Sequence, residues 1–225
     1  MKDKKNIKRS FIYNIIIFVL VLIFTILMFY QIQLFDTGKG NTLDENGFSI
    51  FKFFTVDSNI LLGISSFILA IYEYRVLKKK RSDIPYWVYV IKYMGTCAVA
   101  LTFIITLLWL SPSLGKNFYL LYLNSNFVFH LVAPILAFVS YTKYEKNDLS
   151  FKSTLLCLLP LFSYAIFYVS NLIAHFDNNT VDPKYDFYGF VKGGKGSIAV
   201  ALIIIAMITY IFSFIIFKCN KRKNA

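Results

Sequence analysis

The chain has 225 residues, of which 57% are hydrophobic, 19% aromatic and only 16% charged, and its formal net charge is +12. Soluble domains contain about 45–50% apolar and about 25% charged residues. The composition therefore excludes a soluble enzyme, and the aliphatic and aromatic content excludes a disordered chain. Long apolar windows separated by short basic segments are typical of a polytopic membrane protein.

Six apolar windows are long enough to cross a bilayer, which requires about 20 residues for about 30 Å of hydrocarbon. They lie at residues 11–34, 49–77, 86–111, 119–141, 153–176 and 197–217. We predict an all-α fold in which residues 1–225 form a single integral membrane domain, a bundle of six transmembrane helices without a soluble domain. Gly63 and Gly95 fall inside these windows and would allow neighbouring helices to approach closely.

The basic residues predict the orientation of this bundle. The N-terminal segment, the loops after the second and fourth windows and the C-terminal tail together hold 17 Lys and Arg, whereas the opposite side holds 6. Loops rich in Lys and Arg stay in the cytoplasm, so both termini are predicted to be cytoplasmic. Lys92, inside the third window near that side, can extend its stem to the interface.

The net positive charge is explained by anionic lipid at the cytoplasmic surface rather than by nucleic acid. Membrane lipids are therefore the expected partners, nucleic acid is not expected, and a homo-oligomer is left open. The bias toward Lys, Ile, Asn and Phe favours an AT-rich bacterial genome and hence a multi-pass protein of a bacterial cell membrane. The three cysteines form neither a disulfide framework nor a metal-binding pattern.

Polar side chains gather near one end of three of the windows, although each polar group in hydrocarbon costs roughly 2.5–3.5 kcal/mol on insertion scales. They comprise Thr55, Asp57, Ser58 and Asn59 in the second window, Asn124, Ser125, Asn126 and His130 in the fourth, and Ser170, Asn171 and His175 in the fifth. Under the predicted orientation all three groups lie toward the outer leaflet. We therefore expect them to face one water-accessible cavity.

Both histidines of the chain belong to this set, and each follows an asparagine by four residues, Asn126 for His130 and Asn171 for His175. This spacing places amide and imidazole on one helix face, where the amide can orient its histidine. For any single Ser or Asn, an interhelical hydrogen bond is the structural alternative. His175 is interpreted as a solvated residue at a helix end.

His130 is the stronger functional candidate because it lies well inside the fourth window. Pro134 follows it by four residues and frees a backbone carbonyl one turn away. Asp57, near the outer interface, can be hydrated or paired with a histidine. Two histidines on separate spans with one neighbouring acid are not a reliable ligand set, so neither a metal nor another cofactor is expected.

The segment Phe53-Phe54-Thr55 that opens the second span, Asn59 one turn later, and His130 before the proline of the fourth span together carry a resemblance. The chain resembles the androgen-induced and androgen-dependent TFPI-regulating protein family of six-span membrane hydrolases, and related uncharacterised bacterial membrane proteins. In that family an intramembrane threonine and a histidine hydrolyse esters of hydroxy fatty acids. The resemblance implies Thr55 and His130 as the catalytic pair.

The residues beside Thr55 depart from the animal motif. Ser58 supplies a second hydroxyl and Asp57 an acid with no counterpart there. Amides of Asn59, Asn126 or Asn171 are candidates to stabilise an oxyanion in a low-dielectric site.

These observations predict an intramembrane lipid ester hydrolase that uses a Thr/His pair near the outer leaflet. Two alternatives from other classes stay open. The first is a small transporter or channel in which outer-facing Asp57, His130 and His175 pass ions or protons. The second is a non-catalytic membrane scaffold.

Overall fold

The computed structural model describes residues 2–35, 45–177, 180–182, 184–191 and 194–221. Six helical segments in these ranges are long and apolar enough to cross a membrane, which confirms the number of spans predicted from the sequence. Their bounds are Lys4–Phe29, Phe54–Leu77, Tyr86–Ser113, Asn124–Lys143, Ser153–Ala174 and Gly196–Lys221.

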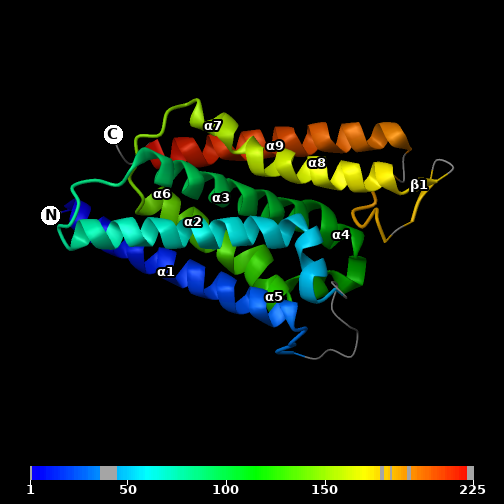
Figure 1. Ribbon diagram of the computed structural model, residues 1–225, viewed down its shortest axis with the longest axis horizontal. Helices are drawn as coiled ribbons and strands as arrows, with labels where there is room; N and C mark the ends of the chain where they lie inside the picture. Colours follow the sequence, from blue (N-terminus) through cyan, green and yellow to red (C-terminus); the bar gives the residue numbers. More distant parts are fainter. Residues whose placement is uncertain (1, 36–44, 178–179, 183, 192–193, 222–225) are drawn as a thin grey trace.

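Several spans are assembled from more than one helical piece (Figure 1). In chain order the elements are α1 (Lys2–Phe29), η1 (Gly47–Lys52), α2 (Phe54–Leu77), α3 (Tyr86–Ile105), η2 (Thr106–Leu110), α4 (Ser111–Ser113), η3 (Gly115–Tyr122), α5 (Asn124–Phe127), η4 (Val128–Val132), α6 (Ala133–Lys143), α7 (Ser153–Leu156), α8 (Leu158–Ala174), β1 (Phe176–Asp177), β2 (Thr180–Val181) and α9 (Lys195–Lys221). Within the described ranges, strand pairing is confined to the two-residue hairpin β1–β2.

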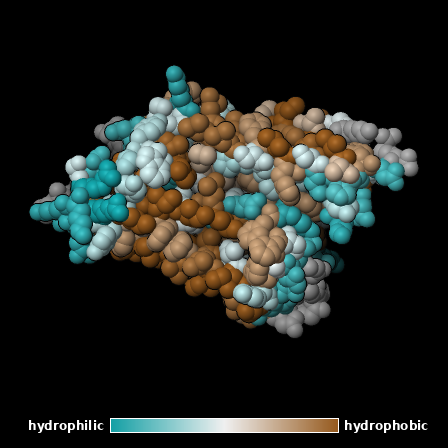
Figure 2. Space-filling model, viewed as in Figure 1, coloured by the Kyte–Doolittle hydropathy of each residue, from teal (hydrophilic) through white to brown (hydrophobic). Residues whose placement is uncertain are grey.

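The two ends of the bundle differ in composition. Both chain termini and the loops at 78–85 and 144–152 lie at one end, which we call the basic end (Figure 1). The pieces η1 and η3 and the hairpin lie at the other, which we call the hairpin end. Figure 2 shows hydrophilic surface at both ends and a largely hydrophobic surface between them, as expected for a protein that crosses a bilayer.

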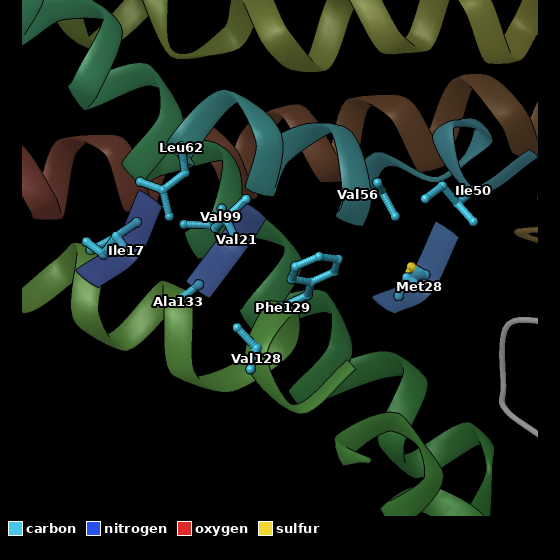
Figure 3. Packing of buried hydrophobic residues seen from close by; sticks show 11 residues of the cluster. Ile17, Val21, Met28, Ile50, Val56, Leu62, Val99, Val128, Phe129 and Ala133 are labelled. Atoms are coloured by element: carbon cyan, nitrogen blue, oxygen red, sulfur yellow. The ribbon is translucent and has the colours of Figure 1, made fainter. Parts of the chain in front are cut away.

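Helix α3 is central, because it packs against α2, α6, α8 and α9. Helices α1 and α9 are peripheral, with most of their apolar residues turned outward. A buried apolar cluster joins α1, η1, α2, α3 and the fourth span (Figure 3). In it Phe129 of η4 lies between Val128 and the side chains of α1 and α2.

The predicted close approaches at two glycines are confirmed. A Cβ atom added to Gly95 of α3 would lie 3.0 Å from Leu62 Cα and 2.9 Å from Ser65 Oγ of α2. A Cβ atom at Gly63 of α2 would lie 2.9 Å from Val21 Cγ1 of α1. The two glycines therefore set the spacing of the α1–α2–α3 layer.

The span boundaries differ from the predicted ones where apolar residues do not continue a helix. The first helix already begins at Lys2 and ends at Phe29, because Gln31 has a positive φ of 53°. Residues 47–52 form the separate helix η1, and extended Phe53 divides them from α2. Residues 119–122 belong to η3, and Asn124, with φ 52°, starts the fourth span. A hydropathy average over about 20 residues does not detect these breaks, because it smooths over the backbone conformation of single residues.

Two π-helical turns interrupt the third and fourth spans, and each precedes a proline. In η2 the Ser111 N–H bonds the Thr106 carbonyl before Pro112, and in η4 the Ala133 N–H bonds the Val128 carbonyl before Pro134. Proline donates no backbone hydrogen bond and its ring crowds the preceding turn, so a wider turn accommodates it. The turn η4 contains His130.

Candidate functional site

Thr55 is the second residue of α2, near the hairpin end. A residue distant in the sequence holds the start of this helix: the Phe54 N–H donates to the hydroxyl of Tyr188 at 3.0 Å. Burial raises the pKa of Tyr188 to about 12, so this phenol stays neutral at physiological pH. The segment before α9 thus positions the first turn of α2, and with it Thr55.

Asn59 connects the turn of Thr55 with the turn of His130. Its side chain is fully buried, and Nδ2 donates to the Thr55 carbonyl at 2.8 Å and to the Phe129 carbonyl at 3.2 Å. Ser58 Oγ also donates to the Thr55 carbonyl, at 3.0 Å. Asn59 is therefore the side chain that ties α2 to η4 beside both catalytic candidates.

His130 is 4% exposed, and its Nδ1 lies 2.8 Å from the backbone carbonyl of Leu121 in η3. A carbonyl oxygen only accepts, so Nδ1 carries the proton in this hydrogen bond. The neutral ring then keeps its lone pair at Nε2, the tautomer that a general base requires. Asn126 is buried on α5, but the Nδ1 bond of His130 goes to Leu121 rather than to this amide.

A large apolar cavity of about 710 Å³ lies beside Thr55. Its walls come from α3, η2, α8, α9 and the segment 188–190, with Thr55 contributed by α2. Most of the lining is aliphatic or aromatic, as in sites that hold an acyl chain. His130 is not among the residues that line this cavity. Thr55 therefore borders the cavity, and His130 does not.

A second cavity, of about 560 Å³, lies between α2 and α8 and contains Asp57 and Ser58. Pro160 and Ser163 of α8 contribute to its opposite wall. Asp57 and Thr55 therefore face different cavities, although only one residue separates them.

The candidates of the fifth span lie at the hairpin end. His175 is exposed, its Nδ1 lies 2.8 Å from the backbone carbonyl of Asn171, and its ring stacks on Tyr185 with centroids 3.5 Å apart. Asn171 Nδ2 donates to the Tyr185 carbonyl at 3.2 Å. Both side chains thus hold the segment that follows the hairpin. The polar candidates of the second, fourth and fifth spans therefore lie in different environments, and not in the one cavity expected from the sequence.

A second polar cluster, which the sequence analysis missed, lies toward the basic end. The interpretation that Lys92 extends to the interface is wrong: its side chain is 0% exposed, and Nζ donates to Ser66 Oγ at 2.7 Å. Lys92 Nζ also lies 3.8 Å from Glu145 Oε1. Glu73, on the same side of the bundle, is buried as well. The sequence does contain one signal for this cluster. A lysine inside a membrane span needs an acidic partner, and Glu73 lies inside the second predicted span.

Comparisons with protein-family models, with curated proteins and with solved structures find no match to this chain. No group of three or more His, Cys, Asp or Glu side chains that could hold a metal ion occurs in the part of the chain that the structure describes. The structure and the composition support a multi-pass membrane protein with six apolar helices.

Proposed function

We propose that the protein is an intramembrane hydrolase of lipid esters, with Thr55 as the nucleophile and His130 as the general base. The observation that carries this proposal is the position of Thr55 on the wall of an apolar cavity of about 710 Å³. A hydroxyl beside such a cavity is placed to meet the carbonyl of an ester whose acyl chain fills the cavity. The tautomer of His130 supports its role as the base.

In the proposed reaction His130 Nε2 accepts the proton of the Thr55 hydroxyl while Oγ1 attacks the ester carbonyl. The tetrahedral oxyanion collapses, the bond to the leaving alkoxide breaks, and the imidazolium returns the proton to that alkoxide. Water, deprotonated by the same imidazole, then attacks the acyl-threonine; the bond to Thr55 Oγ1 breaks, the fatty acid leaves, and the imidazolium returns the proton to Oγ1. Amides of Asn59, Asn126 or Asn171 are the candidates for oxyanion stabilisation.

The proposal requires the two catalytic side chains to come within hydrogen-bond reach once substrate is bound, because catalytic hydrogen bonds often form only in the complex. The Asn59 link between α2 and η4 keeps the two turns adjacent and so limits the movement needed. We further propose that both termini are cytoplasmic in a bacterial cell membrane. The cavity then opens toward the outer leaflet, from which a lipid ester can enter sideways.

The test is the release of free fatty acid from a panel of long-chain esters by the purified protein in detergent. We expect hydrolysis of at least one lipid ester and none of short, water-soluble esters, since only a long chain fills the cavity. A protein that releases no fatty acid, but whose Asp57→Asn variant changes ion flux in liposomes, would support the transporter alternative instead. A protein inactive in both assays would favour the scaffold.

A further inference from the structure

The polar cluster toward the basic end contains two carboxyl groups and one ammonium group that are almost completely removed from solvent. Glu73 of α2 and Glu145, just after α6, are each 2% exposed, and Lys92 of α3 is 0% exposed. Asn14 of α1, also 0% exposed, lies between the two acids: its Nδ2 is 3.3 Å from Glu73 Oε2 and 3.4 Å from Glu145 Oε1. Three segments far apart in the sequence thus meet at this amide, and Lys92 of α3 joins the cluster through Glu145.

Full ionisation would leave this cluster with one uncompensated negative charge. A buried charge without a partner is so costly that the group changes its protonation state instead. Tyr89 of α3 and Tyr141 of α6 are titratable groups that also interact with these carboxyls, and neither supplies a positive charge at neutral pH. The contributions of α1 and α9 are the uncharged side chains of Ser10, Asn14 and Asn220.

The ammonium group lies beside one of the two acids. Glu145 Oε1 accepts from Ser140 Oγ at 2.7 Å, and Lys92 Nζ lies 3.8 Å from the same oxygen. A carboxylate is stabilised by such donors, so Glu145 is the ionised acid. Glu73 interacts with the uncharged side chains of Ser10 and Asn14 instead, and it is the acid to which the remaining proton belongs.

The hydrogen bonds of Asn14 leave room for one more donor. Its Nδ2 lies within reach of Ser10 Oγ at 3.1 Å and of one oxygen each of Glu73 and Glu145, and the Ser10 hydroxyl also interacts with Glu73. Asn14 Oδ1 and Glu145 Oε2 are buried and have no hydrogen-bond partner among the described residues. A carboxylic acid O–H on Glu73 can donate to Asn14 Oδ1 after rotation of the amide.

We propose that Asn14, Glu73, Lys92 and Glu145 form a buried proton-binding site that holds one proton on Glu73 at neutral pH. The site lies away from Thr55 and does not depend on the proposed hydrolase activity. It gives the basic end of the bundle a buried ionisable group beside Glu145, the residue of the loop at 144–152 that enters the cluster.

The test is infrared spectroscopy of the purified protein at pH 7, in an Asp57→Asn background that removes the other intramembrane acid. We expect the carbonyl band of a protonated carboxylic acid, lost in Glu73→Gln and retained in the control Asp148→Asn, whose carboxylate is exposed. A band that persists in Glu73→Gln, or no band in the parent, would overturn the proposal.

A second variant gives an answer even if Glu73→Gln does not fold. In Lys92→Met the two acids lose the buried cation that the structure places beside them, so we expect both to be protonated and the band approximately to double. An unchanged band in Lys92→Met would contradict the charge balance on which the site rests.

Discussion

Asn59 of α2 donates a hydrogen bond to the backbone carbonyl of Phe129 at 3.2 Å, and Phe129 is the residue that precedes His130. This contact joins two spans that are about 70 residues apart in the chain. Because the amide also bonds the carbonyl of Thr55, it couples the position of one catalytic candidate to the other.

The first prediction concerns this link. Replacement of Asn59 by leucine keeps the approximate volume but removes the side-chain donor to the buried Phe129 carbonyl, and an unsatisfied buried acceptor costs about 1–3 kcal/mol. We expect Asn59→Leu to lower the apparent Tm in detergent clearly more than Asn171→Leu, whose amide bonds a partly exposed segment. Equal stability of Asn59→Leu and the parent would show that the link contributes little.

A second prediction concerns the α2–α3 contact. In Gly95→Ala the new methyl group meets the backbone of Leu62 at 3.0 Å, and overpacking of this kind costs about 1–3 kcal/mol. Gly196→Ala is the matched control, because nothing lies within 4 Å of a Cβ atom there and alanine favours a helix. We expect thermal unfolding to show a lower Tm for Gly95→Ala only. An unchanged Tm for Gly95→Ala would mean that α2 and α3 can move apart at little energetic cost.

The third prediction is a pH dependence at Tyr188. Its pKa of about 12 in the folded protein exceeds the ordinary value of about 10, so the folded state holds the phenolic proton more strongly. The resulting stabilisation is complete below about pH 10 and is lost as the pH rises through about 12. The parent should therefore lose stability more steeply over this window than Tyr188→Phe, measured by unfolding at each pH. Parallel profiles would contradict this assignment.

The number of spans follows from hydropathy alone, whereas their ends do not. Breaks at Phe53 and Asn124 depend on backbone dihedrals of single residues, which hydropathy does not report. Pro134 marks the irregular turn at His130, but the hydrogen bond of that ring to Leu121 depends on how η3 folds back. Glu145 was assigned to a loop, and its burial beside Lys92 depends on the register between helices, which periodicity in one sequence does not contain.

A fourth prediction tests the orientation. Thr180 and Ser82 are exposed at opposite ends of the bundle. In a background without the native cysteines, Thr180→Cys should react with a membrane-impermeant maleimide added to intact cells. Ser82→Cys should react only after the cells are opened. Labelling of Ser82→Cys from outside would reverse the proposed topology and place the cavity at the cytoplasmic leaflet.

A fifth prediction separates the two hydroxyls of the first turn of α2. Thr55 lines the large apolar cavity, whereas Ser58 donates to the Thr55 carbonyl and faces the smaller cavity. Ser58→Ala should therefore keep most of the ester hydrolysis while Thr55→Ala loses it. The reverse pattern would move the nucleophile three residues along the helix.

The central claim, that Thr55 and His130 act together as nucleophile and base, is tested most directly by fatty acid release from a lipid ester by four proteins: the parent, Thr55→Ala, His130→Ala and the double variant. Residues that act as one catalytic unit show losses that do not add. We predict that each single variant abolishes release while remaining folded, and that the double variant is no worse than either. Hydrolysis at the parental rate by any of the folded variants would contradict the account.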